Sequence, residues 1–391
     1  MHPIVIIGSG MAAYAVAREF RKLDQDTALM MICADDARNY AKPTLSNALV
    51  GNKAPAQIAL GDAEKMSAQL NMQILNHTWV KKIDAATHTL SLEQEGQTSE
   101  QAYSKLILAL GATPIRLALE GNAAEQLHVV NNLNDYTAFR AELDQKTAQR
   151  VAILGAGLIG CEFANDLQHS GHQATVIDLA QQPLARLLPN DVAQAFQHKL
   201  QQAGIGFALG TTVTAINKDA DAYQVNLANG ETLVADVVLS AIGLRANTEL
   251  AQAAGIATSR GVVTNTQLET SVADIYAVGD CAEVNGTLLP YVMPIMQQAR
   301  ALAKTLSGNT TAVHYPAMPV AVKTPAAPLT VLPVPHDVNV SWHLEAQEDG
   351  LIAKAVDAED TLRGFVLLGA TAGKQRLSLT KLVPDLIPAA L

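Results

Sequence analysis

Two glycine-rich turns, each following a short apolar run, carry the residue types that bind a dinucleotide. The first reads G-S-G-M-A-A over residues 8–13, and the second reads G-A-G-L-I-G over residues 155–160. In such a turn the first glycine permits a sharp bend, the second admits a pyrophosphate, and the last small residue lets the helix pack on the strand. The helix then directs free N–H groups and its positive dipole end at the phosphates. Two such units predict two bound dinucleotides.

Acidic residues end the second apolar run of each unit. Asp35 and Asp36 follow the run 28–33, and Asp178 follows the run 174–177. A carboxylate at this place accepts hydrogen bonds from ribose hydroxyls, at an expected spacing of about 20 residues from the turn. Asp178 would also repel a 2′-phosphate, which predicts NADH over NADPH. Asp35 and Asp36 are both ribose candidates, and either one could instead belong to a solvated acidic loop.

Three further charged residues occupy positions suited to the reactive end of a cofactor. Lys42 is the one cation of the loop 40–46, where it could stabilise negative charge on a reduced ring or bind phosphate, or be an ordinary exposed lysine. Glu162 lies in the first turns of the second helix, near the nicotinamide end, or is a surface acid that satisfies the helix dipole. Asp280 ends a strand-like run in a Gly-Asp turn, where open α/β sheets place ligand contacts. It could accept a hydrogen bond from a sugar-like hydroxyl, or the Gly-Asp pair could be only a turn.

The elements that must position these residues form an α/β pattern followed by a smaller third part. Strand-like runs end in Gly111 and Gly243, and each of these exits marks a point where the chain changes domain. Residues 72–110 alternate in a way that predicts a β-meander. Beyond residue 312, clustered prolines and alternating runs predict a small α+β domain on an antiparallel sheet. The expected segments are 1–112, 113–244, 245–312 and 313–391.

Composition narrows the class of protein. The chain has 391 residues, of which 49% are hydrophobic and 16% charged, as expected for two or three folded domains. A net charge of −10 argues against nucleic acid as a general partner. No leader peptide and no apolar run long enough to span a bilayer is evident, which predicts a cytoplasmic protein. Scattered cysteines predict buried, reduced thiols, with neither a disulfide framework nor a metal site: Cys33, Cys161 and Cys281.

Five strings of residues together resemble the FAD-dependent pyridine nucleotide-disulphide oxidoreductases over almost the whole chain. They read G-S-G-M-A-A, Y-A-K-P-T-L-S, G-A-G-L-I-G-C-E-F-A, I-Y-A-V-G-D-C-A-E and V-K-T-P-A. Within the family, the longer strings resemble most the members that pass electrons from NADH to rubredoxin. The resemblance implies two Rossmann-like domains, one for FAD built from two chain segments and one for NAD inserted between them. A small C-terminal α+β interface domain completes the expected fold.

The resemblance also implies which residues contact the cofactors. Those expected to contact FAD are Gly8, Ser9, Gly10, Met11, Ala12, Ala34, Asp35, Lys42, Val80, Glu162, Asp280, Val292 and Lys323. Those expected to contact NAD are Gly155, Gly157, Leu158, Ile159, Gly160, Asp178 and Gly243. Lys42 and Glu162 are expected to act electrostatically beside the flavin and the nicotinamide, without a covalent role.

One departure from the family pattern bears on the electron acceptor. Disulfide reductases of the family carry a cysteine pair after the second strand, and NADH peroxidases or oxidases carry one cysteine there, whereas the loop 39–43 has none. Electrons must therefore leave the flavin directly for an outside acceptor. Rubredoxin is the expected acceptor, in a transient complex with a monomer or weak dimer. A ferredoxin, oxygen as in an NADH oxidase, and a non-catalytic flavin-binding sensor are the alternatives.

The net charge shapes the expected docking of that acceptor. Rubredoxins are themselves acidic as a family, so docking to an acidic chain requires either a local basic patch or a mostly apolar contact. The candidate basic residues are Lys42, Arg116, Lys323, Lys374, Arg376 and Lys381.

Overall fold

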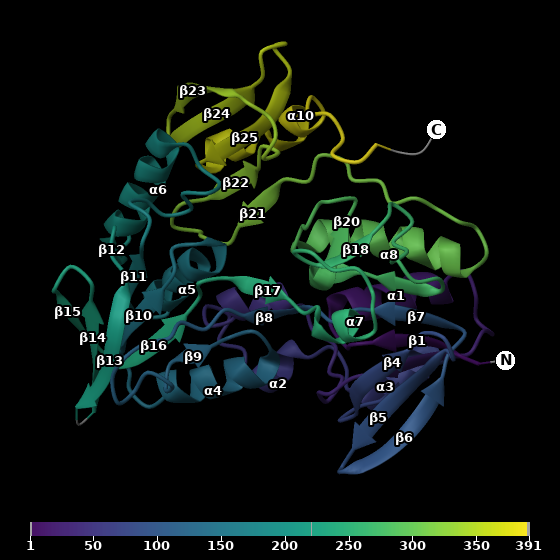
Figure 1. Cartoon of the computed structure of the whole chain (residues 1–391). Helices are drawn as coiled ribbons and strands as arrows, with labels where there is room; N and C mark the ends of the chain where they lie inside the picture. The colour runs from purple at the N-terminus through teal and green to yellow at the C-terminus, as the bar shows by residue number, and fades with distance from the viewer. Residues whose placement is uncertain (1, 220, 389–391) are drawn as a thin grey trace.

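The computed structural model describes residues 2–219 and 221–388 and shows three packed parts. In Figure 1 the C-terminal part lies above the other two, which stand side by side. The chain passes between the two lower parts twice, and the two connecting segments pair with each other. They are β8 (Ala112–Pro114) and β17 (Leu244–Ala246), which run antiparallel. Within the described ranges, no helix combines the length and the apolar character needed to cross a membrane.

The first part is a parallel five-stranded sheet with helices packed on it. Its strands, in spatial order, are β19 (Ile275–Ala277), β7 (Lys105–Leu108), β1 (Ile4–Ile7), β2 (Leu29–Ile32) and β3 (Gln73–Leu75). Every residue of β1 and β2 is buried, as in parallel sheets covered on both faces. The edge strand β19 arrives more than 160 residues after β7 in the chain, so this part is built from two separate segments.

Helices and short elements complete this first part. Helices α1 (Met11–Arg21) and α8 (Val292–Leu306) pack against each other, so the two segments share one core. The smaller elements are η1 (Lys42–Asn47), α2 (Pro55–Ile58), α3 (Ala63–Leu70), α7 (Glu249–Ala253), β18 (Val262–Thr264), η2 (Gly279–Cys281) and β20 (Ala282–Val284).

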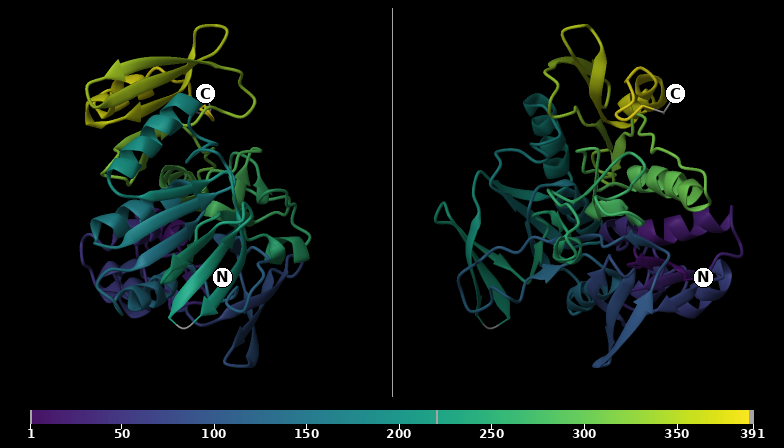
Figure 2. Two further views of the ribbon diagram at one scale, coloured as in Figure 1. Left: turned by 90° about the vertical axis from the view of Figure 1, so that its left-hand side faces the viewer. Right: turned by 45° about the vertical axis from the view of Figure 1, so that its right-hand side comes forward.

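The expected meander over residues 72–110 is only partly present. Strands β4 (Trp79–Asp84), β5 (Thr89–Gln94) and β6 (Gln97–Ala102) form an antiparallel sheet that projects from the body in Figure 2. By contrast, β3 and β7 at the two ends of this stretch belong to the parallel sheet. The run in β7 is buried without alternation, which is the pattern of a strand covered on both faces and not of a meander.

The second part repeats the plan of the first. Its parallel strands, in spatial order, are β12 (Gly206–Leu209), β11 (Gln173–Asp178), β10 (Arg150–Leu154), β16 (Val237–Ser240) and β9 (His128–Val129). Its helices are α4 (Leu133–Leu143), α5 (Leu158–His169) and α6 (Asn190–Gln202). An antiparallel meander lies beside it, formed by β13 (Val213–Asp219), β14 (Ala222–Leu227) and β15 (Thr232–Ala235).

The C-terminal part is an antiparallel sheet with two short helices, which confirms the predicted fold class. Its strands, in spatial order, are β21 (Val320–Val322), β22 (Leu329–Leu332), β25 (Leu362–Leu368), β24 (Gly350–Val356) and β23 (Ser341–Gln347). The helices are α9 (Ala370–Gly373) and α10 (Arg376–Thr380). Helix α6 of the second part packs against β24 and β25 (Figure 2), so this sheet is mounted on the second part.

One apolar core joins three regions that are distant in sequence. It contains Leu45 and Leu49 near η1, Phe163 on α5, and Val322 at the end of β21. A close-packed core of this kind transmits small displacements between the elements that share it. The loop after β2, the second glycine helix and the C-terminal sheet are therefore held in one fixed arrangement.

Candidate functional site

The first glycine turn is shaped to receive a ligand. Gly8 has φ +115°, and a Cβ there would lie 2.3 Å from the carbonyl oxygen of Ala109, so only glycine fits. At Gly10, by contrast, a Cβ would meet nothing within 4 Å. Gly10 is also the N-cap of α1 and offers no capping side chain. The turn thus combines open space with free helix N–H groups, as a pyrophosphate requires.

The second glycine turn reproduces this geometry. A Cβ on Gly155 would lie 2.5 Å from the carbonyl oxygen of Ala241, and one on Gly160 would lie 1.9 Å from the carbonyl oxygen of Gly155. Gly157, the N-cap of α5, again faces space in which nothing lies within 4 Å. The crowded glycines allow the strand, turn and helix to pack, and the open glycine leaves room for phosphate.

A carboxylate stands beside each turn. Asp35 accepts hydrogen bonds from the Ser9 hydroxyl at 2.6 and 2.8 Å and from the backbone N–H of Ala37 at 3.0 Å. Asp178 accepts from the backbone N–H of Ala156 at 2.6 Å and from that of Ala180 at 2.8 Å. Both carboxylates are thereby oriented at the end of the second strand of their unit, where a ribose would lie.

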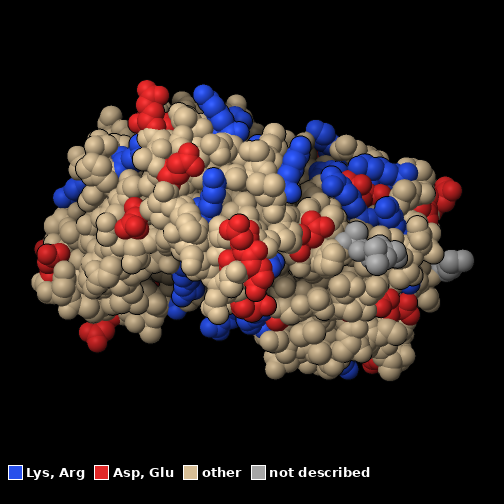
Figure 3. All heavy atoms as spheres, turned by 90° about the horizontal axis from the view of Figure 1, so that it is seen from above, with Lys and Arg blue, Asp and Glu red and all other residues tan. Residues whose placement is uncertain are grey.

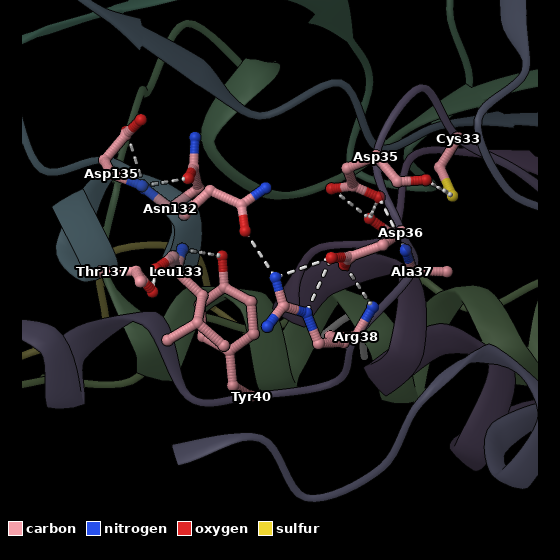
Figure 4. A network of polar contacts seen from close by, with 12 residues as sticks. Cys33, Asp35, Asp36, Ala37, Arg38, Tyr40, Asn132, Leu133, Asp135 and Thr137 are labelled. Atoms are coloured by element: carbon pink, nitrogen blue, oxygen red, sulfur yellow. Dashed lines mark hydrogen bonds and ion pairs between the residues drawn. The ribbon is translucent and has the colours of Figure 1, made fainter. Parts of the chain in front are cut away.

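Asp36 has a different role from Asp35, as Figure 4 shows. Its carboxylate binds the Arg38 guanidinium at 2.6 Å, and Arg38 also donates to the side-chain oxygen of Asn134 at 2.5 Å. The hydroxyl of Tyr40 accepts from the backbone N–H of Leu133 at 3.0 Å. Asp36 therefore takes part in a contact between the loop after β2 and the first turn of α4, which favours Asp35 as the ribose candidate.

Lys42 and Asp280 are half-buried residues of opposite charge, and each influences the pKa of the other. Burial lowers the pKa of Lys42, and the nearby carboxylates of Asp280 and Asp135 oppose that shift. Burial raises the pKa of Asp280, and Lys42 opposes it. No ion pair joins the two among the described residues, so both charged groups are free to contact a ligand. Lys42 is thus not an ordinary exposed lysine.

Glu162 lies at the junction of the three parts. Its side chain is 4% exposed, which excludes a surface acid. It accepts hydrogen bonds from the Ser46 hydroxyl at 2.6 Å and from the backbone N–H of Lys323 at 3.0 Å, and it forms an ion pair with the Lys323 ammonium group. Glu162 and Lys323, 161 residues apart, are therefore brought together beside the loop that carries Lys42.

Apolar residues and glycine line the remaining candidate positions. Val292 and Met293, in the first turn of α8, are 39% and 44% exposed, and the N-cap residue Tyr291 makes no side-chain capping hydrogen bond. Val80 is half-buried on β4. Gly243 has φ +119°, and a Cβ there would meet only a side-chain methyl of Ile115, at 3.7 Å. Exposed valine and methionine beside free helix N–H groups suit one edge of a flat, partly polar ring.

These features fit FAD at the first turn and NAD at the second. Each turn leaves a space that a side chain would fill, each has an oriented carboxylate, and the described structure pairs neither Lys42 nor Asp280 in an ion pair. Across residues 2–219 and 221–388, no group of three His, Cys, Asp or Glu side chains could hold a metal ion. The individual contact residues expected from the sequence stay predictions.

The three cysteines are free and buried, and none lies in the loop that carries Lys42. Burial raises the pKa of the Cys281 thiol to about 11, and it also raises the pKa of the Cys33 and Cys161 thiols. Protonated, buried thiols are poor nucleophiles.

Sequence reasoning missed two residues of this region, Asn165 and Asp166. Both lie on α5 and are 5% and 1% exposed. Asn165 accepts from the backbone N–H of Ala326, and Asp166 accepts from the backbone N–H groups of Leu49 and Val50. The available signal was a polar pair, spaced three and four residues after Glu162, within an otherwise apolar helix.

Comparison with known protein families gives two matches along the chain. Residues 2–304 match the pyridine nucleotide-disulphide oxidoreductases, and residues 312–383 match a rubredoxin binding C-terminal domain. The boundary between the two matches falls where the prolines cluster and the antiparallel sheet begins.

Two full-length relatives share one name, and a solved structure with a similar fold is a reductase of another carrier. A rubredoxin-NAD(+) reductase of Acinetobacter baylyi is 70% identical over 393 aligned positions, covering 100% of both chains. A rubredoxin-NAD(+) reductase of Alcanivorax borkumensis is 42% identical, covering 99% of this chain and 100% of the relative. Among solved structures, a ferredoxin reductase of Rhodopseudomonas palustris has a TM-score of 0.86 at 26% identity and covers 98% of this chain, with 96% of its own length matched.

Proposed function

Because the chain belongs to the pyridine nucleotide-disulphide oxidoreductase family, we propose that it is an NADH-dependent flavoprotein that reduces rubredoxin. The observation that carries the choice of acceptor is the rubredoxin binding domain match over residues 312–383. The two relatives named above, which match this chain over their full lengths, are both rubredoxin-NAD(+) reductases. When bound, FAD supplies the redox chemistry by accepting two electrons as hydride and releasing them singly.

The protein's own residues bind and orient the two dinucleotides. We assign the FAD pyrophosphate to the open space at Gly10 and its ribose to Asp35, and the NADH pyrophosphate to the space at Gly157 and its ribose to Asp178. The two helix N-termini stabilise the phosphate charges. Asp280 lies at the end of the first sheet and would accept from a ribityl hydroxyl.

Buried charges set the electrostatics between the two sites. Lys42 places a cation, whose pKa burial lowers, near where negative charge develops when electrons arrive. Glu162 binds Lys323 and Ser46 and so holds the ammonium group and the loop in place. No side chain forms a covalent bond to substrate in this proposal, since the loop carries no thiol and the three cysteines are buried.

The acceptor would meet a surface with exposed cations. Lys374, Arg376 and Lys381 are exposed on the C-terminal part, and none forms an ion pair with a carboxylate in the described ranges. Figure 3, which views the molecule from above, shows Lys and Arg side chains gathered on one region of this face, with some Asp and Glu side chains among and beside them. Lys323 and Lys42 are occupied or buried, so the free cations of the candidate patch are Arg116 and these three.

The proposal includes a cytoplasmic location, because NADH is the donor and the three free thiols suit a reducing compartment. The test of function is to reduce the purified flavoprotein with NADH and then offer rubredoxin, ferredoxin and oxygen separately. Fastest reoxidation by rubredoxin supports the proposal, and fastest reoxidation by either other acceptor contradicts it.

A further inference from the structure

A row of three buried polar side chains runs along one face of α5. Glu162, Asn165 and Asp166 are spaced by three and four residues, which places them on one side of a helix. They are 4%, 5% and 1% exposed, whereas their neighbours on the helix are mostly apolar. Each one accepts hydrogen bonds from a segment outside the second part of the molecule. The N-terminus of the same helix is the glycine turn assigned to NADH.

Asp166 binds the end of the loop that carries Lys42. Its two oxygens accept from the backbone N–H of Leu49 at 2.9 Å and from that of Val50 at 3.1 Å. No ion pair to a cation accompanies this carboxylate in the described ranges, so its only direct polar contacts there are these two hydrogen bonds, while the charges of His169 and Arg140 act from further away. Charge-assisted hydrogen bonds of this kind are stronger and more directional than neutral ones. A neutral side chain would fill the same space without burying a charge, so packing does not explain the carboxylate.

The segment from Lys42 to Val50 is thereby held at its middle and at its C-terminal end. Lys42 begins η1 near the charge of Asp280, while Ser46 is bound to Glu162 and the backbone at residues 49–50 is bound to Asp166. The three hydrogen bonds that hold the segment beyond Lys42, at Ser46, Leu49 and Val50, are all made to side chains of α5. The position of Lys42 relative to the NADH turn therefore depends on this helix face.

Asn165, between the two acids, contacts a different segment. Its side-chain oxygen accepts from the backbone N–H of Ala326 at 3.1 Å, just after Lys323 and ahead of β22. This contact holds the start of the C-terminal sheet, and it does not involve the loop 42–50. Adjacent side chains thus bind two different neighbours of α5.

We propose that Asp166 is a positioning residue for hydride transfer from NADH, acting through the backbone of Leu49 and Val50 on the loop that carries Lys42. This inference rests on the proposed function. In this role Asp166 itself contacts no ligand and transfers no proton during the reaction. Asn165 is the matched comparison, because it has the same burial and helix face but holds the C-terminal part.

The test compares Asp166→Asn and Asn165→Ala in the flavin-loaded protein, with Asp191→Asn as an exposed control on α6. In Asp166→Asn one acceptor becomes a donor that faces a backbone N–H. We expect amide hydrogen exchange at Leu49 and Val50 to accelerate by about tenfold or more. We also expect the single-turnover rate of flavin reduction at saturating NADH to fall by about tenfold, with the NADH Kd within about twofold of the wild type.

The same variant should retain the second half-reaction. After chemical reduction, Asp166→Asn should pass electrons to rubredoxin at the wild-type rate. Asn165→Ala should show the opposite result: flavin reduction by NADH at the wild-type rate and slower electron transfer to rubredoxin. Wild-type flavin reduction in an Asp166→Asn protein with accelerated exchange would overturn the positioning role, and unchanged exchange would overturn the contact itself.

A second variant covers the case in which Asp166→Asn fails to fold. Ser46→Ala removes the other hydrogen bond between the loop and α5, and it should slow flavin reduction in the same direction by a smaller factor. A wild-type rate in Ser46→Ala would then count against positioning of the loop by α5. If the wild-type protein itself is not reduced by NADH, the proposed function fails, whereas the exchange measurement still decides whether Asp166 holds the loop.

Discussion

Gly8 and Gly10 belong to the same turn but have different surroundings. A side chain on Gly8 would strike the carbonyl oxygen of Ala109, while a side chain on Gly10 would enter open space. Gly10→Val should therefore leave the apoprotein folded, with a melting temperature close to that of the wild-type apoprotein, but should prevent FAD binding. Flavin absorbance after purification and thermal unfolding of the apoprotein measure the two effects. A variant that purifies with full flavin absorbance would contradict the assignment.

The matched variant places the same side chain in the other turn. Gly157 faces a similar open space at the start of α5. Gly157→Val should keep its flavin and lose NADH affinity, so the pair of variants separates the two dinucleotide sites. Loss of flavin in both would show that the turns are not independent sites.

Asp178 determines the choice of nicotinamide cofactor in this proposal. Two backbone N–H groups orient its carboxylate, and a 2′-phosphate at that place would meet a negative charge. Asp178→Ala should reduce the preference for NADH over NADPH, which we expect to be on the order of 10–1,000-fold in kcat/KM in the wild type. The ratio of the two kcat/KM values is the measurement. Equal values for both cofactors in the wild type would contradict the role.

At the scale of elements, the titration of Asp166 on α5 makes the free energy of unfolding depend on pH. Burial raises its pKa to about 6, with the N–H groups of Leu49 and Val50 and the charges of His169 and Arg140 opposing the shift. The side chain of Tyr136 also faces it, and Asp166 contributes to raising the pKa of that phenol. Since the folded protein binds the proton of Asp166 more tightly than the unfolded chain, its contribution favours folding below about pH 4 and is lost as the pH rises through 6.

The corresponding prediction concerns the difference between two proteins. Asp166→Asn does not titrate, so the stability of the wild type minus that of the variant should fall by about 2–3 kcal/mol between pH 4 and pH 7. Chemical denaturation of both proteins across this range gives the difference, and any constant offset from lost hydrogen bonds does not affect its slope. A difference that is flat or rises with pH would contradict the buried, ionised carboxylate.

The elements also show which features the sequence could predict. The glycine turns and the acids at strand ends were predictable, because close packing and phosphate binding restrict the residue types at fixed spacings, as at Gly155 and Asp178. The contacts of Asp166 were not, since its partners are backbone N–H groups more than 110 residues away. The strand β7 was assigned to a meander because a short apolar run does not by itself distinguish a buried parallel strand from other buried segments.

On the scale of the whole molecule, charge governs the meeting with the acceptor. The chain carries a net charge of −10, yet Lys374, Arg376 and Lys381 are exposed together on the C-terminal part without ion-pair partners among the described residues. If an acidic rubredoxin docks on such a patch, screening by salt should slow association, since the attraction reaches only about 10 Å at 0.1 M ionic strength. We therefore expect kcat/KM for rubredoxin to fall as ionic strength rises.

The NADH half-reaction, measured separately over the same range of ionic strength, is the control. A triple substitution of Lys374, Arg376 and Lys381 by Gln should flatten the salt dependence. A rate that climbs steadily with salt would instead indicate an apolar contact between two acidic proteins that repel each other at long range.

The central claim is that this protein carries electrons from NADH to rubredoxin through a bound flavin and without a thiol. The most direct measurement is an anaerobic titration, in which NADH is added to a catalytic amount of the flavoprotein with an excess of oxidised rubredoxin. We predict that the visible absorbance of rubredoxin bleaches with two molecules reduced for each NADH consumed, and that a protein with all three cysteines replaced by serine keeps this activity if it retains its flavin. NADH consumption without bleaching of rubredoxin, or with faster transfer to ferredoxin under the same conditions, would contradict it.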